Sequence, residues 1–228
     1  MESSFLSSEG TRISIKKKQQ FAPKFTGPFF NYEVLAVPTY QPWLFALNIA
    51  VPANAQSRKN IMQSSDFLFN RQPVVSKYQY AVRSYPEASA SQTLTTAEKL
   101  INLSLLEKAN NRTREWVNNL HAQHQDNNKF VAAVLGHFID TPFVYTLRPD
   151  VMLVDPVDRF LFDNQVGFCS HYASALAYAL RIGGIPARIV TGYQGGELVE
   201  NTGKSPYLSI DQYDAHAWVE TWDDDSGW

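Results

Sequence analysis

Cysteine is nearly absent from this chain of 228 residues, which contains one, Cys169. A single cysteine excludes an intramolecular disulfide, and the sequence has neither a Cys-x-x-Cys pair nor a His-Glu-x-x-His segment. Zinc sites draw on such clusters, so we expect no metal site. The glycines at 192–196 lack the Lys-Ser/Thr ending of a phosphate-binding loop. The sequence therefore predicts no cofactor.

Long hydrophobic runs are also missing. A membrane-spanning helix needs roughly 18 apolar residues in succession, and the nearest stretch, 42–55, contains Asn48 and two prolines. The N-terminus does not show the charged region and apolar stretch of a secretory signal. On these grounds alone we expect a chain that does not span a bilayer and stays in the cytoplasm.

Charge of one sign is not in excess, because the formal net charge is -2. The one basic run, at 16–18, lacks interleaved aromatic residues, so nucleic acid is not an expected partner. Hydrophobic residues make up 44% of the chain and aromatic residues 13%, which is typical of a globular protein. The length suits one large or two small domains.

The pattern of apolar residues changes near residue 90. Before it, short segments rich in β-branched and aromatic residues predict strands at 11–18, 32–38, 43–51, 66–71 and 77–85. Residues 86–93 resemble a linker. After it, apolar residues at three- and four-residue steps predict helices at 97–109, 112–123, 126–139 and 169–182, followed by strands at 187–194, 207–210 and 215–222. We therefore predict an α+β protein, with an N-terminal antiparallel β domain at 1–90 that resembles a sandwich and a second domain at 91–228.

Cys169 is predicted to lie in the first turn of the helix at 169–182. The unpaired backbone N–H groups and the dipole at a helix N-terminus favour a thiolate over a thiol. Apolar residues spaced along one face would bury this helix while its N-terminus stays open: Ala173, Leu176, Ala177 and Leu180. A buried, inert cysteine is the alternative, because free cysteines are often core residues.

A nucleophilic cysteine needs a base, and His216 is the best-placed histidine. Strand alternation puts His216 on the same face as Trp218 and Glu220, with small alanines on the other face. His171 would lie about 200° round the helix from Cys169. The other histidines lie on earlier predicted helices, where surface or core roles are expected: His121, His124 and His137.

Three blocks of the sequence resemble the core of the transglutaminase-like superfamily, a permuted relative of the papain-like enzymes. They are 167–173 (GFCSHYA), 181–193 (RIGGIPARIVTGY) and 214–220 (DAHAWVE). More narrowly, 160–197 and 41–47 (QPWLFAL) are similar to bacterial TgpA-like proteins. The resemblance implies a core in which a cysteine-bearing helix packs on an antiparallel sheet, preceded by a β domain.

This resemblance implies acyl transfer through a thioester on protein or peptide amides. Cys169 would be the nucleophile and His216 the general base and acid. The Cys169 backbone N–H and one more donor would bind the oxyanion. Gln165 and Tyr145 are candidates for that donor, with turn and core roles as the alternatives.

The resemblance also implies partners and a location. The substrate would be a protein or peptide carrying glutamine or lysine side chains, or cell-envelope material. In TgpA-like proteins this region is an extracytoplasmic segment held between membrane helices. We therefore expect an excised periplasmic piece of a membrane-anchored protein, and this replaces the cytoplasmic expectation.

The third member of the expected triad is missing from the matched blocks. In the family an aspartate orients the histidine from the next strand, usually shortly after a Gly-Trp pair, which here is Gly227–Trp228. If Trp222 pairs with Trp228 across a turn, His216 would face a position about six residues beyond Trp228. We therefore expect the orienting carboxylate there and regard the core as truncated at its C-terminal end.

Asp214 is the nearby substitute for this carboxylate, and the acidic residues at 223–225 are predicted to be turn residues. The missing residue leaves two alternatives open. One is a non-catalytic module with a degenerate transglutaminase fold that binds peptide or cell-wall material. The other is a cysteine hydrolase or protease.

Overall fold

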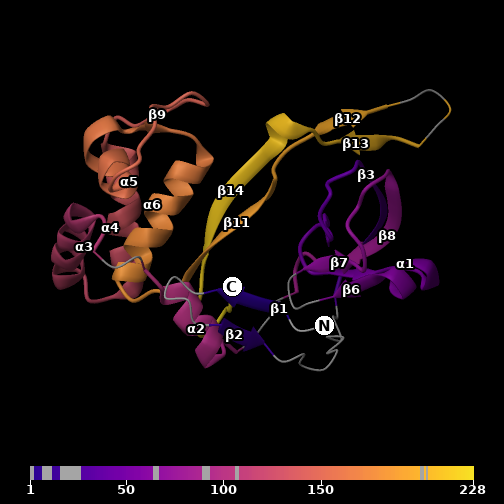
Figure 1. The fold of residues 1–228 in the computed structure, drawn as a ribbon, viewed down its shortest axis with the longest axis horizontal. Helices are drawn as coiled ribbons and strands as arrows, with labels where there is room; N and C mark the ends of the chain where they lie inside the picture. The colour runs from indigo at the N-terminus through magenta and orange to yellow at the C-terminus, as the bar shows by residue number, and fades with distance from the viewer. Residues whose placement is uncertain are drawn as a thin grey trace. The chain divides into compact units, whose positions relative to one another are not determined.

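Figure 1 shows the fold in a computed structural model that describes residues 3–6, 12–15, 27–63, 67–88, 93–105, 108–200, 203 and 205–228. The chain forms two compact units, Met1–Thr93 with Asp224–Trp228, and Leu94–Asp223. The basic run at 16–18 and residues 89–92 of the predicted linker lie outside the described residues. Helices and antiparallel strands are both present, so the predicted α+β class is confirmed.

The N-terminal unit consists mainly of antiparallel strands, as predicted. Strand β1 (Ser3–Leu6) pairs with β2 (Arg12–Ile15). One three-stranded sheet has the order β3 (Phe30–Ala36), β8 (Tyr78–Ser84) and β5 (Ala50–Pro52), and another has the order β4 (Trp43–Leu44), β7 (Leu68–Asn70) and β6 (Ile61–Gln63). Helix α1 (Ala55–Asn60) was not predicted, and the Asn54 side chain caps it by accepting a hydrogen bond from the Ser57 N–H.

The single strand predicted at 43–51 is wrong. The segment forms β4 and β5, which belong to different sheets. Ile49 between them has a φ of 50°, a left-handed conformation that interrupts an extended strand. The core of this unit includes Tyr80, whose hydroxyl donates to the Phe45 carbonyl at 2.7 Å, and burial raises the pKa of this tyrosine.

Four long helices follow in the second unit: α2 (Thr96–Leu103), α3 (Asn111–Gln123), α4 (Asn127–Asp140) and α6 (Cys169–Ile182). The Thr95 side chain accepts from the Glu98 N–H and Glu98 accepts from the Thr95 N–H, which is a capping box. Helix α2 ends earlier than the predicted 97–109. Lys108 and Asn110 have φ values of 58° and 53°, which a right-handed helix cannot contain.

The stretch before Cys169, predicted to be a loop, contains regular structure. Strand β9 (Val144–Tyr145) runs parallel to β10 (Val166–Gly167). Between them lie α5 (Pro156–Asp158) and the π-helix η1 (Arg159–Asn164). Pro156 begins α5, the position where a missing N–H costs least. Hydrophobic periodicity did not reveal these elements because each is too short to show a period.

Two further pairs of strands complete the second unit. Strand β11 (Ala187–Tyr193) pairs antiparallel with β14 (Ala215–Thr221). Strand β12 (Glu197–Val199), which was not predicted, pairs antiparallel with β13 (Tyr207–Ser209), which lies within the strand predicted at 207–210. A 3₁₀ helix, η2 (Gln212–Asp214), precedes β14. Among the described residues, no helix combines the length and apolarity that crossing a bilayer requires.

Helix α6 is buried on more than one side. Of the predicted stripe, Ala173, Ala177 and Leu180 are buried and Leu176 is partly buried. Ala177 and Leu180 belong to a core cluster with residues of α3 and α4, whereas Ala175 belongs to a second cluster with Phe160 of η1. The helix is therefore held between two sets of packed side chains, which fixes the position of its N-terminus.

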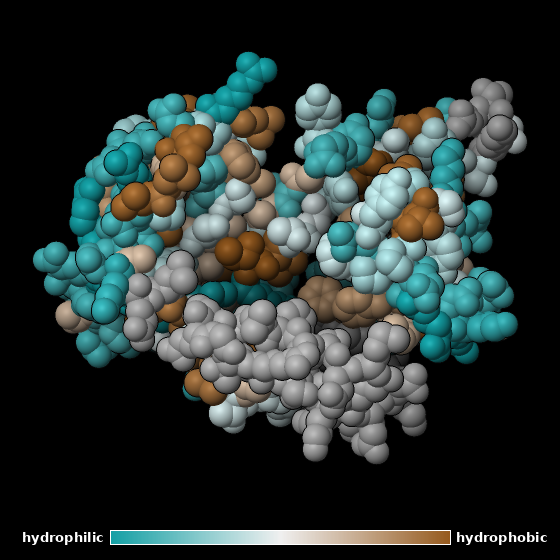
Figure 2. All heavy atoms as spheres, viewed as in Figure 1, coloured by the Kyte–Doolittle hydropathy of each residue, from teal (hydrophilic) through white to brown (hydrophobic). Residues whose placement is uncertain are grey.

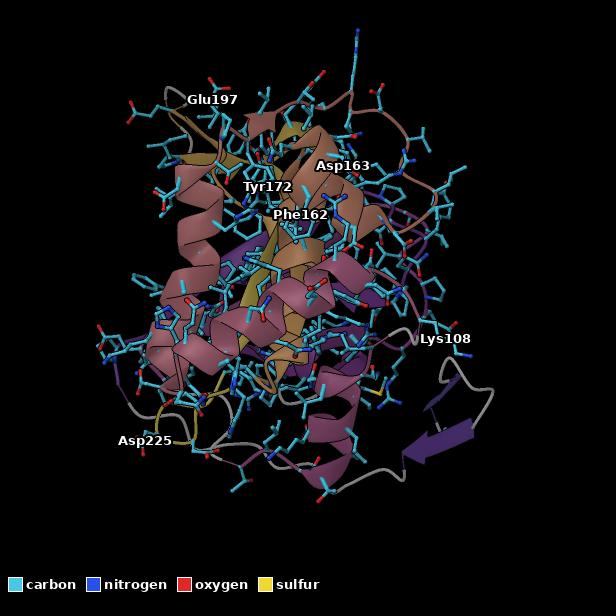
Figure 3. The ribbon with its side chains drawn as sticks, turned by 90° about the vertical axis from the view of Figure 1, so that its left-hand side faces the viewer. Lys108, Phe162, Asp163, Tyr172, Glu197 and Asp225 are labelled. Atoms are coloured by element: carbon cyan, nitrogen blue, oxygen red, sulfur yellow. The ribbon has the colours of Figure 1, made fainter. Side chains whose placement is uncertain are left out.

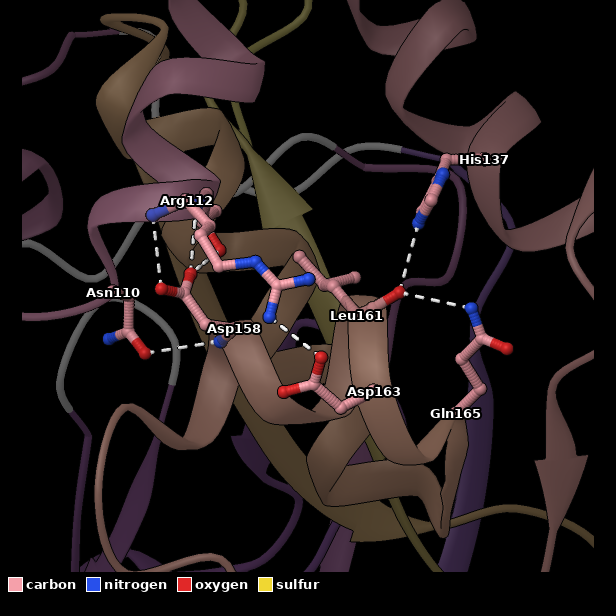
Figure 4. Close-up of polar contacts among 8 residues, drawn as sticks. Asn110, Arg112, His137, Asp158, Leu161, Asp163 and Gln165 are labelled. Carbon is pink, nitrogen blue, oxygen red and sulfur yellow. Dashed lines mark hydrogen bonds and ion pairs between the residues drawn. The ribbon is translucent and has the colours of Figure 1, made fainter.

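The N-termini of α3 and α5 cap each other through two buried side chains (Figure 4). Asp158 Oδ1 accepts from the Thr113 N–H at 2.8 Å, and Asp158 Oδ2 accepts from the Arg112 N–H at 3.0 Å. In return, Asn110 Oδ1 accepts from the Val157 N–H at 3.0 Å and the Asp158 N–H at 3.2 Å. These contacts tie α3 to the segment that leads to Cys169.

We expect Asp158→Ala to destabilise the second unit by about 2–4 kcal/mol. The substitution removes a helix cap and leaves buried N–H groups without acceptors. Asp163→Ala is the matched control, because Asp163 forms an exposed ion pair with Arg112 at 2.7 Å, and exposed pairs contribute under about 1 kcal/mol. Urea denaturation midpoints check this expectation. Equal losses in the two variants would show that the reciprocal caps carry no special stability.

Candidate functional site

Cys169 is the first residue of α6, as predicted, and its side chain is partly exposed. The N-cap position is Phe168, which has no side-chain oxygen that could accept from the N–H groups of the first turn. The first N–H groups of a helix also lack intrahelical acceptors. The helix start therefore presents backbone donors beside the thiol, where a thiolate or an oxyanion can accept from them.

His216 is the second residue of β14, and its side chain is partly buried. In the register of the β11–β14 pair it lies opposite Gly192. Trp218 and Glu220 follow at two-residue steps and share its face, as the alternation predicted. The residue opposite His216 thus contributes no side chain to this face.

Element lengths place the starts of α6 and β14 at the same end of the second unit. Four residues, 183–186, connect α6 to β11, so β11 begins where α6 ends, and Ala187 pairs with Thr221 at the end of β14. The 14 residues of α6 span about 21 Å and the seven residues of β14 span about 23 Å. Helix α6 contacts both strands, and Figure 1 shows it beside them. Cys169 and His216 therefore both lie at the end opposite this connection.

His171 has a local structural role. Its Nδ1 accepts a hydrogen bond from the Phe168 N–H at 3.3 Å, and its ring lies edge-on to the Phe168 ring with centroids 4.5 Å apart. Gly167 makes room for it, because a Cβ at this glycine would lie 2.8 Å from the His171 Cβ. These contacts agree with the expectation that His171 is a poor base for Cys169.

Tyr145, one of the two predicted oxyanion donors, lies beside the first turn of α6. It pairs with Gly167 in the β9–β10 register, and its ring stacks on Tyr172 with centroids 6.2 Å apart. Tyr172 is one helical turn beyond Cys169, and Figure 3 shows its side chain near the middle of the view. Burial and, less strongly, Tyr145 raise the pKa of Tyr172, so its hydroxyl stays protonated at neutral pH.

Gln165, the other predicted donor, is turned toward the π-helix η1. It has a φ of 53°, and its Nε2 donates to the Leu161 carbonyl at 3.4 Å (Figure 4). His137 Nε2 donates to the same carbonyl at 3.3 Å, within a group of aromatic rings. Gln165 would have to leave this carbonyl in order to bind an oxyanion.

Asp214, the predicted substitute for an orienting carboxylate, is engaged in η2. Its Oδ2 accepts from the Asp211 N–H at 2.9 Å, while Asp211 accepts from the Tyr213 N–H at 2.8 Å. This capping uses Oδ2 of Asp214 within η2. The acidic residues 224 and 225 lie in a turn, as predicted, and residue 223 forms the bridge before it.

Two features of the site were missed from the sequence. Glu220 forms an ion pair with Arg188 at 2.6 Å on the face that carries His216, and Tyr172 provides the aromatic partner of Tyr145. The two-residue alternation around His216 could have indicated the first, but the register with β11 was needed to place Arg188 opposite Glu220. Among the described residues, no group of three or more His, Cys, Asp or Glu side chains is arranged to hold a metal ion.

Comparisons with known proteins identify the family of each part of the chain. The model of the transglutaminase-like superfamily matches residues 114–228, and that of the TgpA N-terminal domain matches residues 4–90. A protein-glutamine gamma-glutamyltransferase of Pseudomonas aeruginosa is 43% identical over 202 residues, which are 89% of this chain and 29% of that protein. The uncharacterized protein YebA of Bacillus subtilis is 41% identical over 75 residues, which are 32% of this chain and 10% of that protein. The chain thus spans less than a third of the length of these relatives.

Solved structures agree with the sequence matches. The crystal structure of the periplasmic domain of TgpA from P. aeruginosa has a TM-score of 0.83 and 38% identity, covering all of this chain and 78% of that one. The same domain bound to ethylmercury has a TM-score of 0.82 and 40% identity, covering all of this chain and 80% of that one. The expected resemblance is confirmed: this chain belongs to the transglutaminase-like superfamily, with a TgpA-type N-terminal domain before its core.

Proposed function

We propose that this chain provides the thioester-forming site of a protein-glutamine acyltransferase, with Cys169 as the nucleophile and His216 as the general base and acid. The observation that carries the proposal is that the starts of α6 and β14 lie at the same end of their packing, where the N-cap residue Phe168 has no side-chain acceptor for the first turn of α6. Membership of the transglutaminase-like superfamily and the name of the P. aeruginosa relative support acyl transfer as the chemistry.

Cys169 and His216 are sufficient for every bond change and proton transfer of the reaction. His216 accepts the proton of the Cys169 thiol, and the sulfur attacks the carboxamide carbon of a glutamine side chain. The C–N bond breaks, His216 returns the proton to the leaving nitrogen as ammonia departs, and a thioester remains. An amine then attacks the thioester and gives its proton to His216, which returns it to the sulfur as the isopeptide bond forms. With water in place of the amine, the products are glutamate and free enzyme.

The oxyanion of each tetrahedral intermediate would be bound by the Cys169 backbone N–H and one side chain. The contacts favour Tyr145 for that side chain, because it lies beside Gly167 and stacks on Tyr172 of the first helical turn. Gln165 is the second candidate and would first have to release the Leu161 carbonyl.

We propose protein or peptide substrates that carry glutamine and lysine side chains, in keeping with the name of the relative. Exposed apolar side chains of the β9 region, Val144, Tyr145 and Leu147, would contact residues next to the reactive glutamine. Figure 2 shows hydrophobic side chains at the surface where Figure 1 places α5 and β9. Because the TgpA relatives are periplasmic domains, we propose a periplasmic location, with membrane anchoring through segments outside this chain.

The orienting carboxylate is proposed to come from a strand that pairs with β14 after the turn at 224–226. Residues 223 and 227 are bridge residues on the two sides of this turn. A strand in which residue 227 pairs with residue 223 and the register continues would bring a residue about six positions beyond Trp228 opposite His216.

A binding module is the second candidate, favoured by one observation. Asp214, the nearest carboxylate before His216, has its Oδ2 held by the Asp211 N–H within η2. Such a module would hold a peptide at the same site without cleaving the amide.

Incorporation of a fluorescent primary amine into a glutamine-containing peptide distinguishes these functions. We expect the full-length protein to release one ammonia for each amine incorporated, and to release ammonia more slowly when only water is available. Peptide binding without ammonia release would establish the binding module. Cleavage of the peptide backbone would establish a protease.

A further inference from the structure

Trp218 lies along the face of β14 that carries His216. Its Nε1–H donates to Glu220 Oε1 at 3.3 Å, which directs the five-membered ring toward the later part of the strand. Its other end lies over Gly192, because a Cβ built on this glycine would be 3.1 Å from Trp218 Cη2 and 3.4 Å from Cζ3. The indole therefore extends from Glu220 to the residue directly opposite His216.

Glu220 is itself held by a charged partner. Its Oε2 accepts from Arg188 Nε at 2.8 Å and lies 2.6 Å from Arg188 Nη2. Arg188 is directly opposite Glu220 in the register, and both side chains are about three-quarters buried, with exposures of 23% and 25%. Partly buried, charge-assisted contacts of this kind hold a side chain more firmly than exposed ones. One carboxylate thus fixes both the guanidinium and the indole.

Three neighbours of His216 lie next to it in or just before the β11–β14 pair, and one of them carries a bulky side chain on its face. Gly192 opposite it has no side chain, and Asp214 two residues earlier is bonded to the Asp211 N–H. Trp218, two residues later, is the bulky neighbour whose ring reaches the space above Gly192. A fixed indole against Gly192 therefore occupies space on one side of the residue opposite His216.

We propose that Trp218, clamped by Glu220 and Arg188, is a positioning residue that sets the place of His216 for the proposed acyl transfer. The inference rests on the proposed function and deepens it. It assigns to Gly192 the role of leaving space for the indole beside the histidine. Trp218, Glu220 and Arg188 act through His216 and take no part in the chemistry themselves.

Gly192→Ala tests the proposal most directly, because its new Cβ would meet the indole. A Cβ at 3.1 Å from Trp218 Cη2 would make the indole give way by a few tenths of an ångström. Because misplacement of a reacting group by about 1 Å costs on the order of 100-fold in rate, we expect kcat for amine incorporation to fall by about fivefold with KM within about twofold. The pH profile of kcat/KM should change shape as well. Thr191→Ala is the matched control, since it alters the adjacent residue on the opposite face of β11 and should leave kcat within about twofold.

A double-mutant cycle keeps the proposal testable if Gly192→Ala fails to fold. Trp218→Phe keeps a ring but loses the N–H donor, and Glu220→Gln loses the ion pair that orients the acceptor. We expect each single variant to lower kcat by about tenfold. The double variant should be no slower than the slower single variant, because both changes act on the same Trp218–Glu220 hydrogen bond. Melting temperatures of the three variants separate this effect from a loss of folding.

The possible outcomes separate the two proposals. The positioning proposal is wrong if the variants of the clamp keep the kcat and the pH profile of the Thr191→Ala control: Gly192→Ala, Trp218→Phe and Glu220→Gln. The proposed function still stands in that case, provided that Cys169→Ala abolishes amine incorporation. Fully multiplicative effects in the cycle would also overturn the positioning proposal. If Cys169→Ala retains amine incorporation, the proposed function itself is wrong.

Discussion

Cys169→Ala is expected to abolish thioester formation and to lower kcat/KM for amine incorporation by about a million-fold, the loss seen when the nucleophile of a catalytic triad is removed. The physical reason is that the sulfur at the start of α6 is the atom that bonds to the acyl group. Peptide affinity should change little, because the apolar side chains near β9 remain. The assay measures initial rates of amine incorporation alongside peptide binding by calorimetry.

The control for this variant is Ser170→Ala, which changes the next residue of the same helical turn and leaves the thiol in place. We expect its rate to stay within about threefold of the unaltered protein, as for a substitution away from the chemistry. Since Cys169 is the one cysteine of the 228 residues, thiol reagents report on it alone within this chain. A Cys169→Ala protein with substantial turnover would remove the basis of the proposed mechanism.

His216→Ala should lower kcat by roughly a thousand-fold, within the range attributed to general acid–base catalysis. The effect is expected to be smaller than that of Cys169→Ala because a cysteine retains a few per cent thiolate near pH 7 without a base. Without His216 the leaving ammonia also loses its proton donor. Initial rates of amine incorporation by His216→Ala and by the unaltered protein, measured at one pH, would check this.

The matched comparison is His171→Ala, which removes the imidazole next to the helix start. His171 accepts from the Phe168 N–H, so this variant should lose stability and keep the shape of the pH profile. The same iodoacetamide reactivity of Cys169 in the unaltered protein and in His216→Ala would argue against a functional pair. A larger fall in kcat in His171→Ala than in His216→Ala would show that His216 is not the base.

The sequence was sufficient to predict the elements that carry the two reactive residues. Helix α6 runs from Cys169 to Ile182 in the structure, with the bounds predicted from the loop before it and the paired glycines after it. Strands β11 and β14 also lie within one residue of the predicted limits. Long segments with a regular spacing of apolar residues give a strong local signal, so their type follows from the sequence.

Other parts of the fold depend on contacts that the sequence does not show. The π-helix η1 and the parallel β9–β10 pair were predicted to be a loop, because each is short and is stabilised by partners far along the chain. Asp158, for example, caps a helix that begins 47 residues before it. The role of Asp158 could be found only after the two helix starts were brought together.

The two proposed reactive residues of the candidate site could be predicted from the sequence, but the contacts around them could not. The residue types and the helix start pointed to Cys169, and strand alternation pointed to His216 and the face it shares with Trp218. The Arg188–Glu220 ion pair and the position of the indole over Gly192 required the cross-strand register. Spacing within one strand says nothing about the residue opposite it.

Mass spectrometry of the protein mixed with a glutamine-containing peptide, quenched in acid within seconds, tests the central claim most directly. The expected result is a covalent adduct on Cys169 whose mass equals that of the peptide minus ammonia, and which disappears when a primary amine is added. An unmodified Cys169 under conditions in which ammonia is released, or an acyl group attached to another residue, would contradict the account.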